Sequence, residues 1–246
     1  MSSFFIPLAV VSSAGFQCFN SALDLGYVPL PPGKYASTDR HRWRNAATSC
    51  FNGVVVSALV VYCLFVHPES WHEPQTYYSV LAEACLSIIS GYLVYDTWDI
   101  VIHTGLVKKW TVLLHHIIVA FLFYMLCRER LEIGSCIISL LTEVSAIFLH
   151  SRQLLLIHGF SKSSPVYRVH KLFTIVTGVS CRLVPVAYVC YLSFFRMQPE
   201  MPVMLAVALP LLTLAVLVIN CTMITRLIRS DFLSTRTNKV DFIMEN

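Results

Sequence analysis

The chain has 246 residues, of which 56% are apolar types and only 13% are charged, and its mean hydropathy is +0.66. Soluble domains carry about 25% charged residues, so a soluble fold of this size could not cover its surface with so few charges. The apolar content also excludes disordered, collagen-like and disulfide-rich secreted proteins. We therefore expect an all-α integral membrane protein.

Apolar stretches long enough to cross a bilayer recur along the whole chain. They run approximately over residues 3–23, 46–66, 79–103, 110–127, 133–157, 172–195 and 200–225. About seven transmembrane helices of this length leave no room for a separate soluble domain. The first stretch has no basic segment before it, which favours a retained helix over a cleaved signal peptide.

The lysines and arginines predict the orientation of these spans. Fourteen of the eighteen lie after spans one, three and five or in the C-terminal tail, whereas the alternate loops hold only Arg128, Arg130 and Arg196. We expect the N-terminus outside and the C-terminus in the cytoplasm. The basic loops would face anionic lipid head groups, so the net charge of +4 suggests a membrane partner and no nucleic acid. Because the tail lacks a KDEL-type retrieval signal, we favour the plasma membrane over the endoplasmic reticulum.

Cysteines and a glycosylation sequon complete the features of the spans. The nine cysteines show no paired spacing and are interpreted as apolar fillers, although Cys127 and Cys136 flank one outer loop and could pair. Asn220 begins an Asn-x-Thr sequon inside the last span, where we expect it to be unused.

Ionisable side chains in the third span form the first candidate for a site. Tyr92, Asp96, Asp99 and His103 follow the spacing i, i+4, i+7 and i+11 and so share one helical face. One alternative is a solvated helix end at the membrane interface. Two carboxylates one turn apart repel each other unless one is protonated or both meet a cation. That need for a partner favours a site inside the bundle.

The next three spans add further polar groups, and such groups usually face a bundle interior. His115 and His116 open the fourth span and point about 100° apart, so one could face the site. Glu143 lies deep in the fifth span and Arg182 near the middle of the sixth. Arginine needs an acceptor, and we expect Glu143 or a lipid phosphate in that role. The chain has neither an HxxxH nor an HExxH pattern, so we expect no metal.

At these residues the sequence resembles the TLC domain family over roughly residues 40–230. The markers, in chain order, are Gly91-Tyr92 with Asp96 and Asp99, His115-His116, Glu143-Val144-Ser145, Tyr167-Arg168-Val169 and Arg182-Leu183-Val184-Pro185. The set is most similar to the subgroup of TLC domain-containing proteins 1 and 2. The resemblance implies six helices around a lipid-accessible cavity (40–230), preceded by one further transmembrane helix with a basic loop (1–39) and followed by a cytoplasmic tail (231–246).

The resemblance also implies functions. Ceramide synthases of the family transfer an acyl group from coenzyme A, and their functional histidine pair corresponds to His115 and His116. Their later HDxxD motif corresponds here to residues 142–146, where only Glu143 is retained, and this argues against ceramide synthesis. The closer subgroup implies control of membrane phospholipid composition and fluidity, through the acyl chains of phosphatidylethanolamine and limited incorporation of polyunsaturated chains.

Two hypotheses follow. In the first, the protein is an acyltransferase that uses acyl-coenzyme A as co-substrate and no cofactor. His116 or His115 is the base or acyl carrier, and Asp96 or Asp99 orients the imidazole. The side chains expected to bind substrate are Glu143, Arg182, Tyr92, Lys108 and Lys109. In the second hypothesis, the cavity binds a phospholipid without catalysis and the protein regulates another membrane enzyme or channel.

Overall fold

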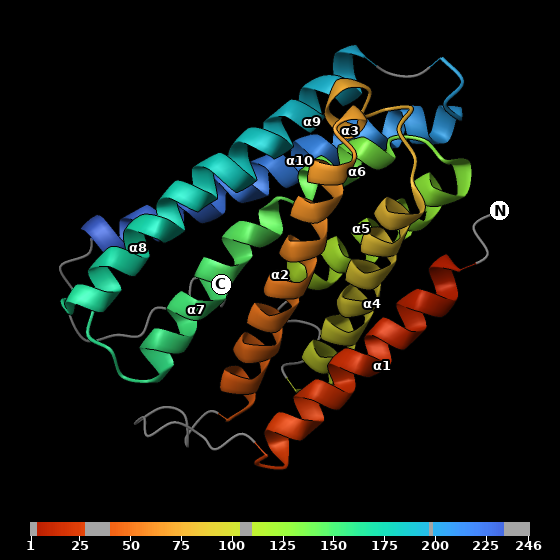
Figure 1. The fold of residues 1–246 in the computed structure, drawn as a ribbon. Helices are drawn as coiled ribbons and strands as arrows, with labels where there is room; N and C mark the ends of the chain where they lie inside the picture. The colour runs from red at the N-terminus through yellow and green to blue at the C-terminus, as the bar shows by residue number, and fades with distance from the viewer. Residues whose placement is uncertain (1–3, 28–39, 104–109, 197–198, 234–246) are drawn as a thin grey trace.

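The computed structural model describes residues 4–27, 40–103, 110–196 and 199–233. These residues are almost entirely helical (Figure 1). The α-helices are α1 (Phe5–Asp24), α2 (Arg40–Val66), α3 (Glu69–His72), α4 (Val80–His103), α5 (Trp110–Glu129), α6 (Ile133–Ser139), α7 (Thr142–Ile157), α8 (Pro165–Thr177), α9 (Val184–Phe195) and α10 (Val203–Ile228). Two π-helical turns are η1 (Gly178–Leu183) and η2 (Arg229–Leu233).

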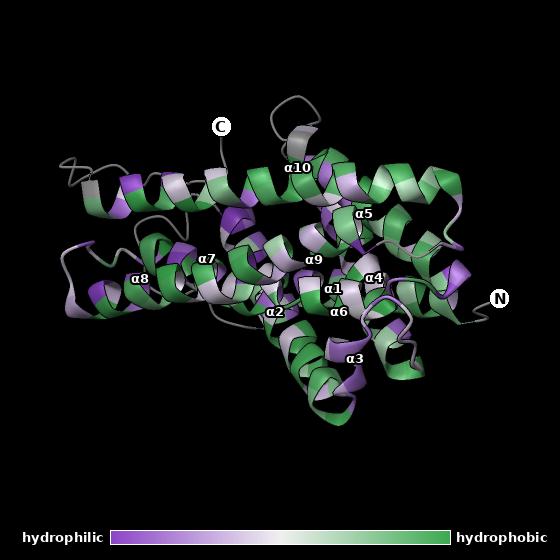
Figure 2. Cartoon of the chain, turned by 90° about the horizontal axis from the view of Figure 1, so that it is seen from above, coloured by the Kyte–Doolittle hydropathy of each residue, from purple (hydrophilic) through white to green (hydrophobic). Residues whose placement is uncertain are grey.

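Within the described residues, seven helical stretches are long and apolar enough to cross a membrane, which confirms the expected all-α, multi-pass architecture. Figure 2 shows apolar residues along most of the long helices, with hydrophilic residues both at helix ends and near the middle of the bundle. The predicted boundaries differ by more than three residues in three places. The second span begins at Arg40 and not at 46, the sixth at Pro165 and not at 172, and the seventh ends at Phe232 and not at 225.

The fifth and sixth spans are irregular helices. The fifth is broken between Ser139 and Thr142, so that α6 and α7 are separate helices. The sixth runs unbroken from α8 through η1 to α9, and η1 widens the helix one turn before Pro185. Single π-helical turns inside α-helices are frequent at functional sites. Here the widened turn carries Arg182.

The bundle is built around α2 and α4. Helix α1 lies against α4 on one side, α5 packs on another face of α4, and α7 packs along α2 (Figure 1). Helices α8, α9 and α10 lie beyond α7 and cover that flank. Helix α2 therefore contacts both α4 and α7, while α5 contacts α4.

Close packing of α1 on α4 depends on Gly91. A Cβ atom placed on Gly91 would lie 2.3 Å from the backbone oxygen of Ala9 and 2.7 Å from the Cβ of Ser12. The Ser12 hydroxyl donates a hydrogen bond of 2.8 Å to the backbone oxygen of Ile88. Small residues at such crossings allow helix backbones to approach closely within a membrane.

A buried ion pair joins α7 and α8 to η2, the turn that follows α10. Arg152 donates two hydrogen bonds to Asp231, from Nε at 2.7 Å and from Nη2 at 2.5 Å, and the Tyr167 hydroxyl donates a third at 3.0 Å. Both charged side chains are almost inaccessible to solvent. The pair fixes η2, at the end of the last span, against the fifth and sixth spans.

The cysteines and the sequon lie as the sequence analysis expected, with one alternative not realised. All nine cysteines are free thiols, and Cys127 and Cys136 are both buried and unpaired. Asn220 is buried in α10 and accepts a hydrogen bond from Arg182, so the sequon lies inside a span.

Candidate functional site

The polar face of α4 is buried and meets α2. Tyr92, Asp96 and Asp99 are buried, and Asn45 of α2 lies opposite the two carboxylates. Its Nδ2 atom donates to Asp96 Oδ1 at 2.8 Å and to Asp99 Oδ2 at 3.3 Å. An amide therefore contacts both carboxylates, where a cation or a shared proton had been expected from the sequence.

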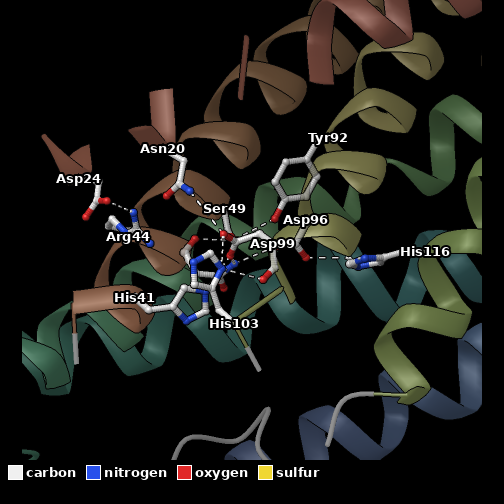
Figure 3. A network of polar contacts seen from close by, with 11 residues as sticks. Asn20, Asp24, His41, Arg44, Ser49, Tyr92, Asp96, Asp99, His103 and His116 are labelled. Carbon is white, nitrogen blue, oxygen red and sulfur yellow. Dashed lines mark hydrogen bonds and ion pairs between the residues drawn. The ribbon is translucent and has the colours of Figure 1, made fainter. Parts of the chain in front are cut away.

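Asp99 lies at the end of this face, where side chains from α1, α2 and α4 contact its carboxylate (Figure 3). His41 Nε2 of α2 is 2.9 Å from its Oδ2, and His103 Nδ1 of α4 is 3.3 Å from its Oδ1. The Asn20 side chain of α1 donates to Oδ1 at 3.4 Å. The structure thus places Asp99 against His41 and His103, and away from the histidine pair of α5 that it was expected to orient.

Asp96 is the carboxylate that faces the histidine pair. His116 is buried, and its Nδ1 lies 3.7 Å from Asp96 Oδ2 and 3.4 Å from the Thr97 hydroxyl (Figure 3). A separation of 3.7 Å is too long for a hydrogen bond, but catalytic contacts are often long before substrate binds. His115 points elsewhere, its ring centroid 5.9 Å from that of His116, and lies within electrostatic range of Arg182.

Glu143 and Arg182 do not form the ion pair that the sequence suggested. The Arg182 guanidinium donates to three neutral acceptors: the Ser145 hydroxyl at 3.0 Å, the Asn220 side-chain oxygen at 3.1 Å and the Thr142 backbone oxygen at 3.0 Å. Glu143 instead accepts a hydrogen bond of 3.0 Å from Asn52 Nδ2. The two charges are within electrostatic range without touching.

Helix α2 contributes a polar stripe that the sequence analysis missed. His41, Asn45, Ser49 and Asn52 follow the spacing i, i+4, i+8 and i+11 and face α4 and α7. Ser49 accepts a hydrogen bond of 2.8 Å from the Tyr92 hydroxyl. The same helical spacing that identified the α4 face would have identified this stripe, had uncharged amides and hydroxyls been included.

Two hollows adjoin the polar groups. A small cavity of about 70 Å³ lies between α7, η1 and α10, beside Arg182 and Arg152. A larger apolar groove of about 710 Å³ runs between α1, α4 and α5, past Trp98, Ala120 and Tyr124. Ala120 and Tyr124 lie one and two turns beyond His116 on the same face of α5, and His116 itself does not line the groove.

Two predicted residues, Lys108 and Lys109, lie outside the described part of the chain. The remaining predicted side chains come together in two groups. Asp96, His116 and Tyr92 lie where α4 contacts α2 and α5. Glu143 and Arg182 lie where α7 contacts α2 and η1. His115 neighbours the first group and is within electrostatic range of Arg182 in the second.

A family model described as the TLC domain matches residues 42–229, which is most of the chain. The chain belongs to the TLC domain family. This membership confirms the resemblance seen in the sequence, and α1, which supplies Asn20 to Asp99, precedes the matched region.

Individual TLC domain relatives align along nearly their whole length. The chain is 28% identical over 236 residues to TLC domain-containing protein 2 of Danio rerio, covering 95% of this chain and 93% of the relative. It is 28% identical over 234 residues to TLC domain-containing protein 1 of Mus musculus, covering 94% and 91%. The corresponding figures for TLC domain-containing protein 2 of Homo sapiens are 25% over 229 residues, 92% and 85%. No solved structure matches the chain.

Proposed function

We propose that this multi-pass TLC domain protein binds membrane phospholipids and controls their acyl-chain composition by acyl transfer at His116. The observation that carries the proposal is the apolar groove of α1, α4 and α5, whose lining includes Ala120, one helical turn from the buried His116, which lies 3.7 Å from Asp96. An acyl chain needs an apolar channel, and its reactive end needs a base. These two elements lie within one or two helical turns of each other.

The proposed chemistry assigns one role to each group. His116 removes the proton from the acceptor hydroxyl, whose oxygen then bonds to the thioester carbonyl carbon. The carbon–sulfur bond breaks, and the leaving thiolate takes the proton back from the imidazolium. Asp96, 3.7 Å away, stabilises that imidazolium. His115 is the second candidate for the base.

Arg182 is proposed to hold the negative charge of a phosphate or of the oxyanion. A guanidinium has five N–H groups, and three contacts to neutral oxygens leave capacity for an anion. The small cavity beside Arg182 gives such a ligand room. Glu143 shapes this region through Asn52, and Tyr92 shapes the neighbouring His116 group through Ser49.

The finer assignments are part of the same proposal. The donor is an acyl-coenzyme A, the acceptor is lysophosphatidylethanolamine, and the outcome is limited incorporation of polyunsaturated chains and control of membrane fluidity. The protein lies in the plasma membrane, with the endoplasmic reticulum as the alternative, and its C-terminus is cytoplasmic. The distribution of lysine and arginine among the loops supports this orientation.

The test is a turnover assay of purified protein with labelled acyl-coenzyme A and lysophosphatidylethanolamine. We expect His116→Ala to lower the rate by about 100-fold or more, because general bases contribute about 10²–10⁴-fold. His72→Ala, an exposed histidine of α3, is the matched control and should keep the wild-type rate. Equal rates for wild type and His116→Ala would contradict the proposed mechanism.

A non-catalytic lipid-binding regulator is the second candidate. It is favoured by the residues at the HDxxD positions, where Thr142 and Ala146 replace the histidine and the last aspartate. Under this alternative, wild-type protein binds phosphatidylethanolamine without turnover. The lipid profile of knockout cells would then be restored equally by wild type and by His116→Ala.

A further inference from the structure

Three side chains with metal-binding chemistry converge where α2 begins and α4 ends. His41 lies in the first turn of α2, and Asp99 and His103 lie one turn apart at the end of α4 (Figure 3). One possible ligand atom from each residue lies within 4.8 Å of the others. His41 Nε2 is already 2.9 Å from Asp99 Oδ2, so small side-chain rotations would bring three donors around one ion.

The carboxylate of this cluster is held in place before any ion binds. Asp99 is 2% exposed, and the side-chain amides of Asn20 and Asn45 donate to its two oxygens at 3.4 Å and 3.3 Å. His103 Nδ1 lies 3.0 Å from the backbone oxygen of Asp99, a contact that an ion bound to Nδ1 would replace. The hydrogen bonds from Asn20 and Asn45 to the Asp99 carboxylate are of the kind that supports a metal ligand.

The charges around the cluster favour a cation. Asp96 and Asp99 are both buried and share a contact to one amide. Two nearby arginines contact Asp24: Arg44 Nη1 lies 2.9 Å and Arg40 Nε 3.2 Å from its carboxylate. A divalent ion at Asp99 would therefore offset charge in a region of low dielectric where paired carboxylates are costly.

The donor set selects among metals. Two imidazoles and one carboxylate suit zinc and related transition metals, whereas magnesium and calcium prefer oxygen ligands alone. The site is accessible to an ion, because the His41 and His103 side chains are 25% and 39% exposed. Three protein ligands leave a fourth position open, as in zinc sites that take a water or an anionic oxygen.

We propose that His41, Asp99 and His103 bind one zinc ion, which joins the start of α2 to the end of α4. The ion lies at the end of the polar α4 face, with Asp96 on the turn between it and His116. The proposal does not depend on acyl transfer, because it concerns the ligands of Asp99 and not the base. It would stand if His116 proved inert.

The test is zinc binding to full-length protein, purified with a tag that contains no histidine, reconstituted in nanodiscs and stripped with a chelator. Isothermal titration and metal analysis should give about one zinc per chain. His41→Ala and His103→Ala should each weaken binding by at least about tenfold, since even supporting residues of metal sites are worth 10–100-fold. His72→Ala, at the other end of α2 and α4, should bind as the wild type does.

A second measurement separates ligand loss from misfolding. Zinc should raise the thermal unfolding midpoint of the wild type and of His72→Ala, and raise it less in the two ligand variants. Magnesium should raise none of them. His103→Ala should keep its helical circular dichroism, because the side chain is partly exposed. Absence of saturable zinc binding to the wild type, or unchanged binding by both ligand variants, would overturn the proposal.

Discussion

The contact between α1 and α4 gives a sharp test of the packing. Replacing Gly91 with Ala puts a Cβ 2.3 Å from the backbone oxygen of Ala9, and a backbone atom cannot yield as a flexible side chain can. Overpacking of this kind costs about 1–3 kcal/mol. If α1 moves away, the Ser12 hydrogen bond to Ile88 is also weakened, at about 0.6 kcal/mol for an average interhelical bond in a membrane.

The matched control is Gly15→Ala on α1, where a new Cβ meets no atom within 4 Å. Both substitutions gain up to about 1 kcal/mol of helix propensity, so their difference isolates the packing cost. In nanodiscs, Gly91→Ala should unfold about 2–12 °C below Gly15→Ala, at about 2–4 °C per kcal/mol for a chain of this size. Equal midpoints for the two variants would refute the close approach of α1 to α4.

Two further substitutions test buried charges outside the candidate site. Burial raises the pKa of Glu132 despite hydrogen bonds from Ser135 and Gln75, so the stability it contributes is present at low pH and lost as pH rises through that raised pKa. Glu132→Gln should flatten this part of the curve in thermal unfolding between pH 4 and 8, and an unchanged curve would contradict it. Asp231→Asn should destabilise by about 3–5 kcal/mol, because Arg152 stays buried without a counter-charge. Replacing both Arg152 and Asp231 with apolar residues should recover most of that lost stability in the same unfolding assay.

The spans were predictable because lipid-facing helices are apolar along most of their length, and this pattern needs no knowledge of the partners. Their ends were less predictable. The first turns of α2 are too polar for a hydropathy window, yet they are helical because tertiary contacts hold them. Trp43 is buried and donates to His158, and Arg44 pairs with Asp24 of α1. Such contacts join residues far apart in the chain.

The candidate site was predictable where its residues are charged, whereas the expected ion pair of Glu143 with Arg182 was wrong. Asp96, Glu143 and Arg182 stand out in apolar spans, because a buried charge is costly and therefore rare. Their partners are mostly neutral: Asn45, Asn52, Ser145 and Asn220 supply hydrogen bonds. An opposite charge is one way to stabilise a buried charged side chain, and hydrogen bonds from neutral amides and hydroxyls are another. Residue spacing does not reveal which of the two a fold uses.

The expectation of no metal and the proposed zinc site differ for a related reason. The absence of HxxxH and HExxH argues only against a site on one helix, because those patterns describe ligands one turn apart. His103 and Asp99 do lie one turn apart, but the pair reads DxxxH, and the third donor, His41, is 58 residues away from Asp99. It reaches the cluster because α2 starts where α4 ends. A three-donor site made by two antiparallel helix ends can be found only after the helices are placed.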